Sequence, residues 1–360
     1  KYMKKLILIF ILPILLSGCY DYNQLDDLAI ISGIGIDYED QEYQVTFEII
    51  STKKEGETSA SSSTYTVTSK GDNLVYAFTK AANQMDKVPY FEHVEVIVFS
   101  KDVALHHLEE CVDYLIRSER LRNEFYAVIA EDSAKDLISA SSREHPIVSS
   151  FLVQLLEYNL ETYNSAYYIQ FTKTLNSILS EGQDAMLPIF KVDDKKIALD
   201  GLGVFKDYEL VMTFNNEETS IINMLNNFNV ESIHFKTTCG NDQDVVIADY
   251  KSDFKIEPGK DQLLVKGTIN ARISENNCEY NLKDPDTYIE LEKEFTKVIE
   301  KEIDQVLKKL QASQSNALNI GRSYYSKYRV KDFLKWTKQD ISYDIDLKIN
   351  KKGLTFEVKS

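Results

Sequence analysis

Cysteine and histidine are the residues of this chain best suited to bind a metal, form a disulfide or attack a substrate. After Cys19 the sequence has Cys111, Cys239 and Cys278, without a CxxC pair and without a Cys/His spacing that fits zinc. Cys111 lies on the apolar side of a helix-like stretch, where a cysteine is usually a small buried hydrophobe. Three cysteines are too few for a disulfide scaffold, so we expect Cys239 and Cys278 to be unpaired. A bridge between them is the alternative if the chain is exported.

Other patterns that would identify an enzyme or a cofactor site are missing from the sequence. It has no GxxxxGK[ST], HExxH, GxSxG or EF-hand loop. The GIG stretch at 33–35 and the GLG stretch at 201–203 lack the third glycine of a dinucleotide-binding turn. The adjacent His106 and His107 would point to different sides of a helix, which is poor geometry for one metal ion. We therefore expect no enzymatic activity, no catalytic residue, no metal and no dissociable cofactor.

Cys19 follows a segment that is typical of a bacterial export signal. Three lysines, at positions 1, 4 and 5, precede 11 uninterrupted apolar residues at 6–16. As a helix this run would reach only ~17 Å, which is too short for a bilayer core of ~30 Å. The run is therefore expected to be the apolar core of a signal peptide instead of a membrane span.

The four residues Leu16, Ser17, Gly18 and Cys19 resemble a bacterial lipobox. In proteins with that motif, the cysteine thiol is acylated with diacylglycerol. The chain is cleaved just before this cysteine, next to small residues that leave the peptide bond accessible. The resemblance implies that residues 1–18 are a lipoprotein signal peptide and that Cys19 carries a covalent diacylglycerol lipid. The alternative is an ordinary secretory signal with an incidental cysteine.

Composition and charge limit the classes of protein to which the remaining chain can belong. With 43% apolar and 27% charged residues among 360, it has the composition of a globular protein. The net charge is −16 and no basic face is evident, so a nucleic-acid partner is not expected. Removal of residues 1–18 leaves 38 basic and 57 acidic residues, a net charge of −19. No second apolar run approaches the ~18 residues of a span, so the lipid would hold an extracytoplasmic folded body at the membrane.

Hydrophobic periodicity divides the chain into three segments. Strand-like runs alternate with helical stretches in residues 19–131, helices precede several strands in 132–255, and a strand, a long helix and a final strand follow in 256–360. Within the first segment, the acidic stretch 37–41 separates two strands and predicts a hairpin. We expect an α+β protein of three mixed α/β domains with these boundaries. Each would be a small, largely antiparallel or mixed sheet covered by helices.

The most regular pattern in the sequence begins at Asp284 and Pro285, which are typical of a helix N-terminus. Apolar residues recur every three or four positions as far as residue 310, and the opposite face is rich in glutamate and lysine. This stripe predicts a helix whose apolar side covers a sheet; a helix that docks on a partner is the alternative. The apolar positions are Tyr288, Leu291, Phe295, Ile299, Ile303, Val306 and Leu310. A second helix is expected at 329–336 and a last strand at 341–358.

Several stretches of the sequence resemble the Ger(x)C lipoproteins, which are the C subunits of spore germinant receptors. Residues 19–37, CYDYNQLDDLAIISGIGID, are similar to the mature N-terminus of that family. Residues 201–211, GLGVFKDYELV, and the NEET stretch at 216–219 resemble its second hallmark. The third hallmark is the C-terminal strand and long helix, followed by LNIG at 318–321 and a tryptophan-bearing segment. Tyr20 stands where the family usually has tryptophan, and it keeps the amphipathic aromatic character.

This resemblance implies a nonenzymatic, lipid-anchored subunit on the outer face of the cytoplasmic membrane, which is the inner membrane of the spore. It implies two integral-membrane partners, an A subunit and a transporter-like B subunit. It also implies a role in germination triggered by small nutrients such as amino acids and sugars, and a fold of three mixed α/β domains around separate sheets. Neither the identity of the nutrient nor direct binding of the germinant by this subunit follows from the resemblance.

A solute-binding lipoprotein that captures a small nutrient directly is the alternative function. Such proteins usually have two doubly wound lobes with regular βαβα alternation, whereas strands cluster in hairpins here. An extracytoplasmic hydrolase is disfavoured because no nucleophile, base or metal set is visible. For an adaptor, surface aromatic residues are the candidate partner interface. Two tyrosine clusters are candidates: Tyr163, Tyr167 and Tyr168, and Tyr324, Tyr325 and Tyr328.

Overall fold

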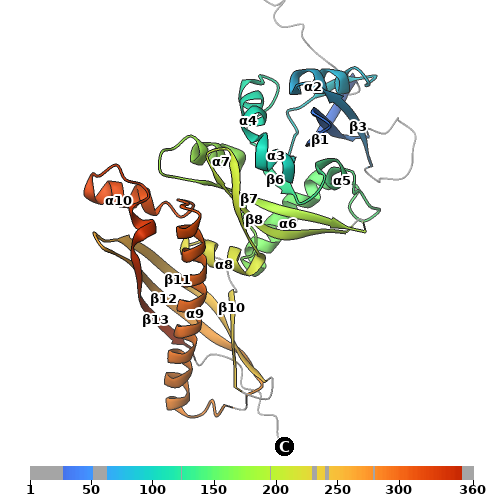
Figure 1. The fold of residues 1–360 in the computed structure, drawn as a ribbon. Coiled ribbons are helices and arrows are strands. Elements are labelled where there is room, and N and C mark those ends of the chain that lie inside the picture. The colour runs from blue at the N-terminus through green and yellow to red at the C-terminus, as the bar shows by residue number, and fades with distance from the viewer. Residues whose placement is uncertain are drawn as a thin grey trace, which may run out of the picture.

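The computed structural model shows an elongated molecule built from two β-sheets, each with helices packed on it (Figure 1). It describes residues 27–51, 63–122, 124–194, 196–228, 233–239, 243–278 and 280–350. The expected signal peptide, Cys19 and the last part of the expected final strand lie outside these ranges. Within them, no helix is long and apolar enough to cross a membrane.

The first sheet has nine strands and is mixed. Its strands are β1 (Leu28–Glu39), β2 (Glu42–Ile50), β3 (Thr64–Gly71), β4 (Val88–Tyr90), β5 (Val96–Ser100), β6 (Tyr126–Ala130), β7 (Ala185–Asp193), β8 (Lys196–Lys206) and β9 (Glu209–Phe214). The order is β3-β2-β1-β5-β6-β7-β8-β9, and β4 pairs with the start of β1. Neighbours from β1 through β5 and β6 to β7 run parallel, whereas β3-β2-β1 and β7-β8-β9 are antiparallel. The hairpin expected around 37–41 is confirmed as β1–β2.

Helices cover both faces of this sheet, as expected for parallel strands that need crossover connections. They are α2 (Leu74–Ala82), α3 (Lys101–His106), α4 (Leu108–Arg117), α5 (Ala134–Ile138), α6 (Val148–Tyr163) and α7 (Phe171–Ile178). Side chains of α2, α3, α4 and α7 share one core with Phe47 and Phe99, and α5 and α6 share another with Val98 and Val128. The helix-like stretch that contains Cys111 begins after His107, whose backbone leaves the helical region and separates α3 from α4.

Two buried carboxylates of the first hairpin fix the helices of the second face. Asp37 accepts hydrogen bonds from the backbone N–H groups of Ala134 (2.7 Å) and Lys135 (2.9 Å), at the start of α5. Glu48 accepts a bond from the N–H of Ser149 (3.0 Å), at the start of α6. A helix N-terminus has unpaired N–H groups and a positive dipole end, so each carboxylate satisfies groups that would otherwise lack partners.

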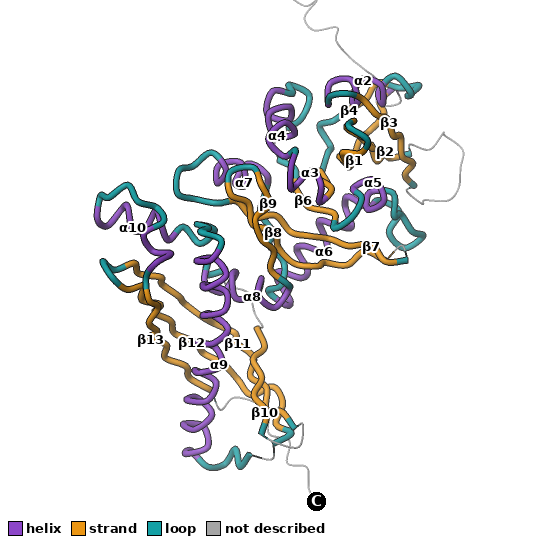
Figure 2. Tube along the Cα trace, viewed as in Figure 1, coloured by secondary structure: helices purple, strands orange, loops and turns teal. Residues whose placement is uncertain are grey.

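The second sheet has four strands, in the order β10-β11-β12-β13, with a long helix lying along it (Figure 2). Its strands are β10 (Ile233–Thr238), β11 (Asp244–Pro258), β12 (Gln262–Asn276) and β13 (Asp340–Ile349), and its helices are α8 (Asn216–Leu225), α9 (Pro285–Ala312), α10 (Ile320–Tyr328) and the short 3-10 helix η2 (Lys335–Lys338). The β12 and β13 strands are parallel, and α9 and α10 connect them.

Helix α9 begins and packs as its sequence predicts. The Asp284 side chain accepts a hydrogen bond from the N–H of Asp286 (3.0 Å), and Pro285 is the first helical residue. The apolar stripe lies in the core of the second sheet, which confirms that it covers a sheet. Its buried members are Leu291, Phe295, Ile299, Ile303, Val306, Leu307 and Leu310.

The α+β class with more than one domain is confirmed, but strand pairing differs from the expected separate sheets. The strands β7, β8 and β9 extend the first sheet, because β7 pairs with β6 through Ile129–Ile189 and Ala130–Phe190. The strands β10 and β11 pair with β12, and the boundary expected after residue 255 falls inside β11. The helix expected at 329–336 is also misplaced, because α10 ends at residue 328 and the short 3-10 helix η2 begins only at residue 335.

Candidate functional site at the junction of the two sheets

A buried asparagine joins the two sheets in the loop between α9 and α10. The Oδ1 atom of Asn316 accepts hydrogen bonds from the indole N–H of Trp336 (2.8 Å) and from the N–H of Gly321 (3.1 Å). The N–H of Asn316 donates to the carboxylate of Asp184, directly before β7 (2.7 Å). Burial raises the pKa of Asp184, and the bond from Asn316 acts in the opposite direction. One residue therefore connects α10, η2 and the first sheet.

A second set of amides holds α8 between the sheets. The fully buried Asn223 donates through Nδ2 to the carbonyls of Asn164 (2.9 Å) and Ala166 (2.8 Å), in the connection from α6 to α7. Asn227 pairs with the backbone of Phe254 in β11, donating to its carbonyl (2.8 Å) and accepting from its N–H (2.7 Å). An amide side chain supplies both a donor and an acceptor, so it can satisfy backbone groups of loops. These contacts fix α8 and the residues after it to the connection between α6 and α7 and to β11 of the second sheet.

A cavity of about 350 Å³ lies at this junction, lined by residues from α7, the start of β7, the end of α8 and the α9–α10 loop. The Gln183 side chain donates to the Ser177 hydroxyl (2.8 Å) and accepts from Arg322 (2.9 Å). Because the Asp184 carboxylate accepts from Asn316, three polar groups of the lining are already paired within the protein. The Oδ1 atom of Asn319 is buried in this lining and has no hydrogen-bond partner in the part of the chain that the structure describes.

The first tyrosine cluster does not form one surface. Tyr167 lines the junction cavity and packs on Phe228, with ring centroids 5.9 Å apart, and its burial raises its pKa. Tyr168 stacks on Tyr126 at 4.6 Å. Tyr163, at the end of α6, is 50% exposed. Of these three candidate interface residues, only Tyr163 lies open on the surface.

The second tyrosine cluster stays together on α10. Tyr324 is buried and lies against Tyr328, with ring centroids 4.8 Å apart. Tyr325 lies beside Phe333 and is 39% exposed. The structure therefore places one open tyrosine at this surface and uses the other two chiefly for packing.

The structure pairs Cys239 with Cys278, which corrects the expectation of two unpaired thiols. Cys239 follows β10 and Cys278 follows β12, and both strands pair with β11, so their ends meet at one end of the sheet. Cys111 is free and buried, as expected. The lipobox-like residues 16–19 lie outside the described ranges, so lipidation of Cys19 stays a prediction.

Among the described residues, no group of three or more His, Cys, Asp or Glu side chains could hold a metal ion. The rings of His106 and His107 lie 6.4 Å apart, and His107 packs on Tyr38 at 3.7 Å instead.

Sequence patterns do not single out the junction residues Asn316, Asn223 and Asp184. The nearest signal is the LNIG stretch at 318–321, which begins two residues after Asn316. Asparagine and aspartate are common in loops, so their types alone carry no information about a buried network.

Comparison with known families covers most of the chain. Residues 21–192 match the family described as the spore germination protein N-terminal domain, and residues 200–353 match the one described as spore germination B3/GerAC-like, C-terminal. The chain belongs to the Ger(x)C family of spore germination proteins. The two matched regions meet within the β7–β8 hairpin, so the last strands of the first sheet lie in the family's C-terminal region.

Two relatives named as spore germination proteins match along nearly their whole length. The chain is 25% identical to spore germination protein KC of Bacillus subtilis (strain 168), over 97% of this chain and 94% of the relative. It is 23% identical to spore germination protein GerQC of Bacillus cereus, over 98% of this chain and 100% of the relative. The crystal structure of the GerBC protein matches with a TM-score of 0.53 and 17% identity, covering 91% of this chain and 99% of that one. The last comparison shows a shared fold.

Proposed function

We propose that this chain is the lipid-anchored C subunit of a spore germinant receptor, and that it is a nonenzymatic adaptor between membrane subunits. The observation that carries this proposal is the Ger(x)C match along the whole length of relatives named as spore germination proteins. The subunit would lie on the outer face of the cytoplasmic membrane, the inner membrane of the spore. Diacylglycerol on Cys19 would hold it there, beside integral-membrane A and B subunits.

The bridge between Cys239 and Cys278 supports a location outside the cytoplasm. Disulfides persist in oxidising compartments and are rare in the cytosol. Cys19 lies only eight positions before Asp27, where the described chain begins, and eight residues of extended chain span at most ~29 Å. A lipid on Cys19 would therefore keep the folded body close to the bilayer surface.

An adaptor needs binding surfaces that keep a fixed relative position, each of about 800 Å² per partner. The amide network of Asn316, Asn223 and Asn227 supplies this property, because it ties the first sheet, α8 and the second sheet together. A partner bound to one sheet would then position a partner bound to the other. The open tyrosines Tyr163 and Tyr325 are the aromatic residues from the predicted clusters that remain available for such contacts.

Anchoring is tested by Cys19→Ala in the full-length chain expressed in the spore-forming host. A diacylglyceryl group buries many methylenes at ~0.8 kcal/mol each, so its loss should release most of the protein from the membrane fraction or leave it uncleaved. Ser17→Ala is the matched control, because it keeps a small residue at the cleavage site and should be processed normally. Cleaved Cys19→Ala protein that stays fully membrane-bound would refute a lipid anchor as the main attachment.

Assembly is tested by affinity purification of the full-length chain from detergent-solubilised spore membranes. We expect two integral-membrane proteins to co-purify with it, and nutrient-triggered germination to fail when the chain is deleted. Recovery of the chain without any membrane protein, from spores that germinate normally after its deletion, would contradict the adaptor role.

Direct capture of a small nutrient is the second candidate function, and the junction cavity favours it. Its volume of about 350 Å³ lies at the lower end of the ~300–1,000 Å³ that small-molecule sites usually occupy. Calorimetric titration of the folded body with amino acids and sugars tests this function. Binding that Asn319→Ala weakens, but that Gln154→Ala preserves, would favour capture over a purely adaptor role, because Gln154 is exposed on α6 and does not line the cavity.

A further inference from the structure

The segment formed by α10, the following loop and η2 (residues 320–339, the basic segment) has a charge opposite to that of the rest of the protein. It contains six basic residues and one acidic residue, a net charge of +5, which leaves −21 for the remainder of the chain. The basic residues are all exposed: Arg322, Lys327, Arg329, Lys331, Lys335 and Lys338. The chain therefore has a basic face although its net charge is negative, which corrects the expectation that it has none.

Basic side chains and one aromatic ring are exposed together on α10 and directly after it. Arg322 and Tyr325 lie three positions apart on its exposed side, whereas Tyr324 is buried. Arg329 caps the C-terminal end of α10 in the left-handed conformation (φ 58°), and its side chain is also exposed. Val330 continues this surface directly after the helix and is 49% exposed. Exposed cations interleaved with tyrosine and a branched aliphatic residue are the composition of an interfacial helix at a lipid surface.

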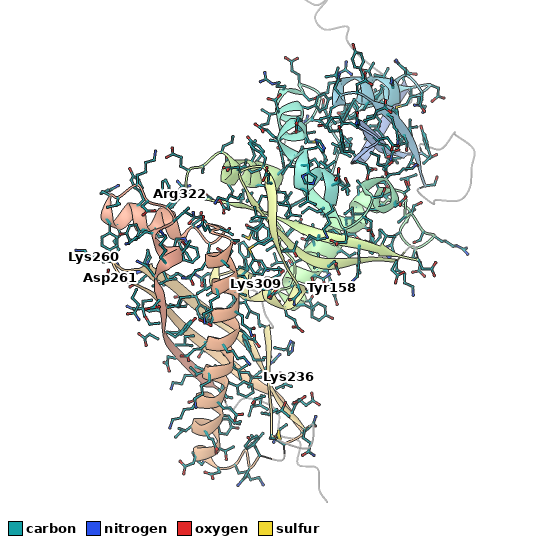
Figure 3. The ribbon with its side chains drawn as sticks, in the orientation of Figure 1. Tyr158, Lys236, Lys260, Asp261, Lys309 and Arg322 are labelled. Atoms are coloured by element: carbon teal, nitrogen blue, oxygen red, sulfur yellow. A yellow bond between two sulfur atoms is a disulfide. The ribbon has the colours of Figure 1, made fainter. Side chains whose placement is uncertain are left out.

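The basic segment is fastened to the second sheet, so its side chains are presented from a fixed backbone. Its Trp336 is fully buried in the core of the second sheet. The Gln339 side chain donates to the carbonyls of Gly259 (2.8 Å) and Lys260 (3.1 Å), in the turn between β11 and β12. Figure 3 shows Arg322, Lys260 and Asp261 at the same outer end of the second sheet. The charges of Lys260 and Asp261 cancel, so the turn leaves the positive charge of the segment unchanged.

Among the residues that the structure describes, the side chains of half of these cations form no ion pair or hydrogen bond. Lys331 pairs with Glu181 (2.7 Å) and Arg322 donates to a neutral amide. Lys327 donates to the carbonyl of Pro258 (3.2 Å). The remaining three, Arg329, Lys335 and Lys338, form no ion pair within the described ranges of the chain. They are therefore free to pair with an external anion.

We propose that the basic segment docks on anionic phospholipid headgroups of the membrane surface. Each Lys or Arg near such a surface contributes about 1 kcal/mol, and the repulsion of acidic groups elsewhere in the protein falls off over a Debye length of ~8 Å. The proposal rests on the proposed lipid anchor only because the anchor would place the segment near a bilayer. An anchored chain meets that bilayer at high effective concentration, so even weak headgroup binding would orient the body.

The test uses flotation with vesicles of phosphatidylcholine containing about one-third phosphatidylglycerol, and with phosphatidylcholine alone. The protein is the chain from residue 19 with Cys19→Ser, so that no acyl chain contributes. We expect binding to the anionic vesicles only. Combined Arg329→Gln, Lys335→Gln and Lys338→Gln should weaken it by roughly ten- to hundredfold. Raising the salt from ~0.1 M to ~1 M shortens the Debye length from ~10 Å to ~3 Å and should also abolish it.

The matched control removes three exposed lysines from α9, at positions 293, 297 and 301, by the same change to glutamine. This control changes the net charge equally and should leave vesicle binding within twofold of the parent. Circular dichroism confirms that both variants are folded.

Equal loss of vesicle binding in both variants, or no preference of the parent for anionic vesicles, would overturn the proposal. The proposal would also be overturned if the 329/335/338 variant binds vesicles normally but no longer co-purifies membrane proteins, because the segment would then bind a protein. If the Cys19→Ala protein stays bound to the membrane in the fractionation experiment, the lipid anchor is refuted, but the vesicle-binding result is unaffected.

Discussion

At the residue scale, the Oδ1 atom of Asn316 is the acceptor for two buried N–H groups beside the junction of the two sheets. Asn316→Ala would leave the indole N–H of Trp336 and the N–H of Gly321 without their acceptor in a buried site. An unpaired buried donor costs about 1–3 kcal/mol, so we expect the free energy of unfolding to fall by about 2 kcal/mol or more. Trp336 is the single tryptophan, so its fluorescence during urea unfolding reports on this site. The exposed Asn176→Ala control should change stability by less than ~0.5 kcal/mol, and equal losses would contradict the argument.

Asp37 contributes a pH dependence whose sign follows from its burial. Burial raises the pKa of Asp37 in the folded protein, although the N–H groups of Lys135 and Ala134 favour its carboxylate form. Between its ordinary and its raised pKa, the folded state binds more protons than the unfolded state. The contribution of Asp37 to stability is therefore fully present below the ordinary pKa and falls as the pH rises through the raised one.

Asp37→Asn, which cannot ionise, should remove this part of the pH dependence. We expect the unfolding free energy of the parent minus that of the variant to decrease as the pH rises from acidic toward neutral, measured by urea titration at each pH. A difference that increases with pH would show that the hydrogen bonds to the carboxylate outweigh its burial.

At the element scale, α9 is a structural helix whose apolar stripe closes the second sheet. Phe295 is fully buried there, whereas Lys301 is exposed on the opposite side. Phe295→Ala removes a buried ring and should lower the free energy of unfolding by about 3–5 kcal/mol. Lys301→Ala should change it by less than ~0.5 kcal/mol. Thermal unfolding of the two variants tests this prediction. Equal melting temperatures, together with a loss of partner binding in the Phe295→Ala variant, would show that α9 is a docking helix.

At the scale of the whole molecule, the two sheets share apolar core and should unfold together. Met186, Leu202, Val204 and Phe214 belong to the first sheet, yet they lie in one core with α8, α9 and the second sheet. Unfolding of the second sheet would expose these side chains to water and destabilise the first. We expect a single calorimetric transition whose midpoint agrees with those from circular dichroism and Trp336 fluorescence. Two separated transitions would show that the sheets are independent units.

The sequence by itself determines the features of this protein that depend on neighbouring residues. Asp284, Pro285 and the stripe that includes Phe295 specify α9, because helical hydrogen bonds and side-chain contacts link residues only three or four positions apart. The acidic stretch 37–41 specifies the first hairpin in the same way. Family membership was also evident, because the stretches at 19–37 and 201–211 keep their order along the chain.

Only the tertiary structure decides which distant segments meet. It extends the first sheet through the β6–β7 pairing, brings Cys239 to Cys278 across β11, and places Asn316 between Asp184 and Trp336. It also presents the cations of residues 320–339 together on one outer surface. Strands of similar pattern can pair in many orders, and the choice among them depends on packing of the whole core. That collective choice has no signature in any single stretch of sequence.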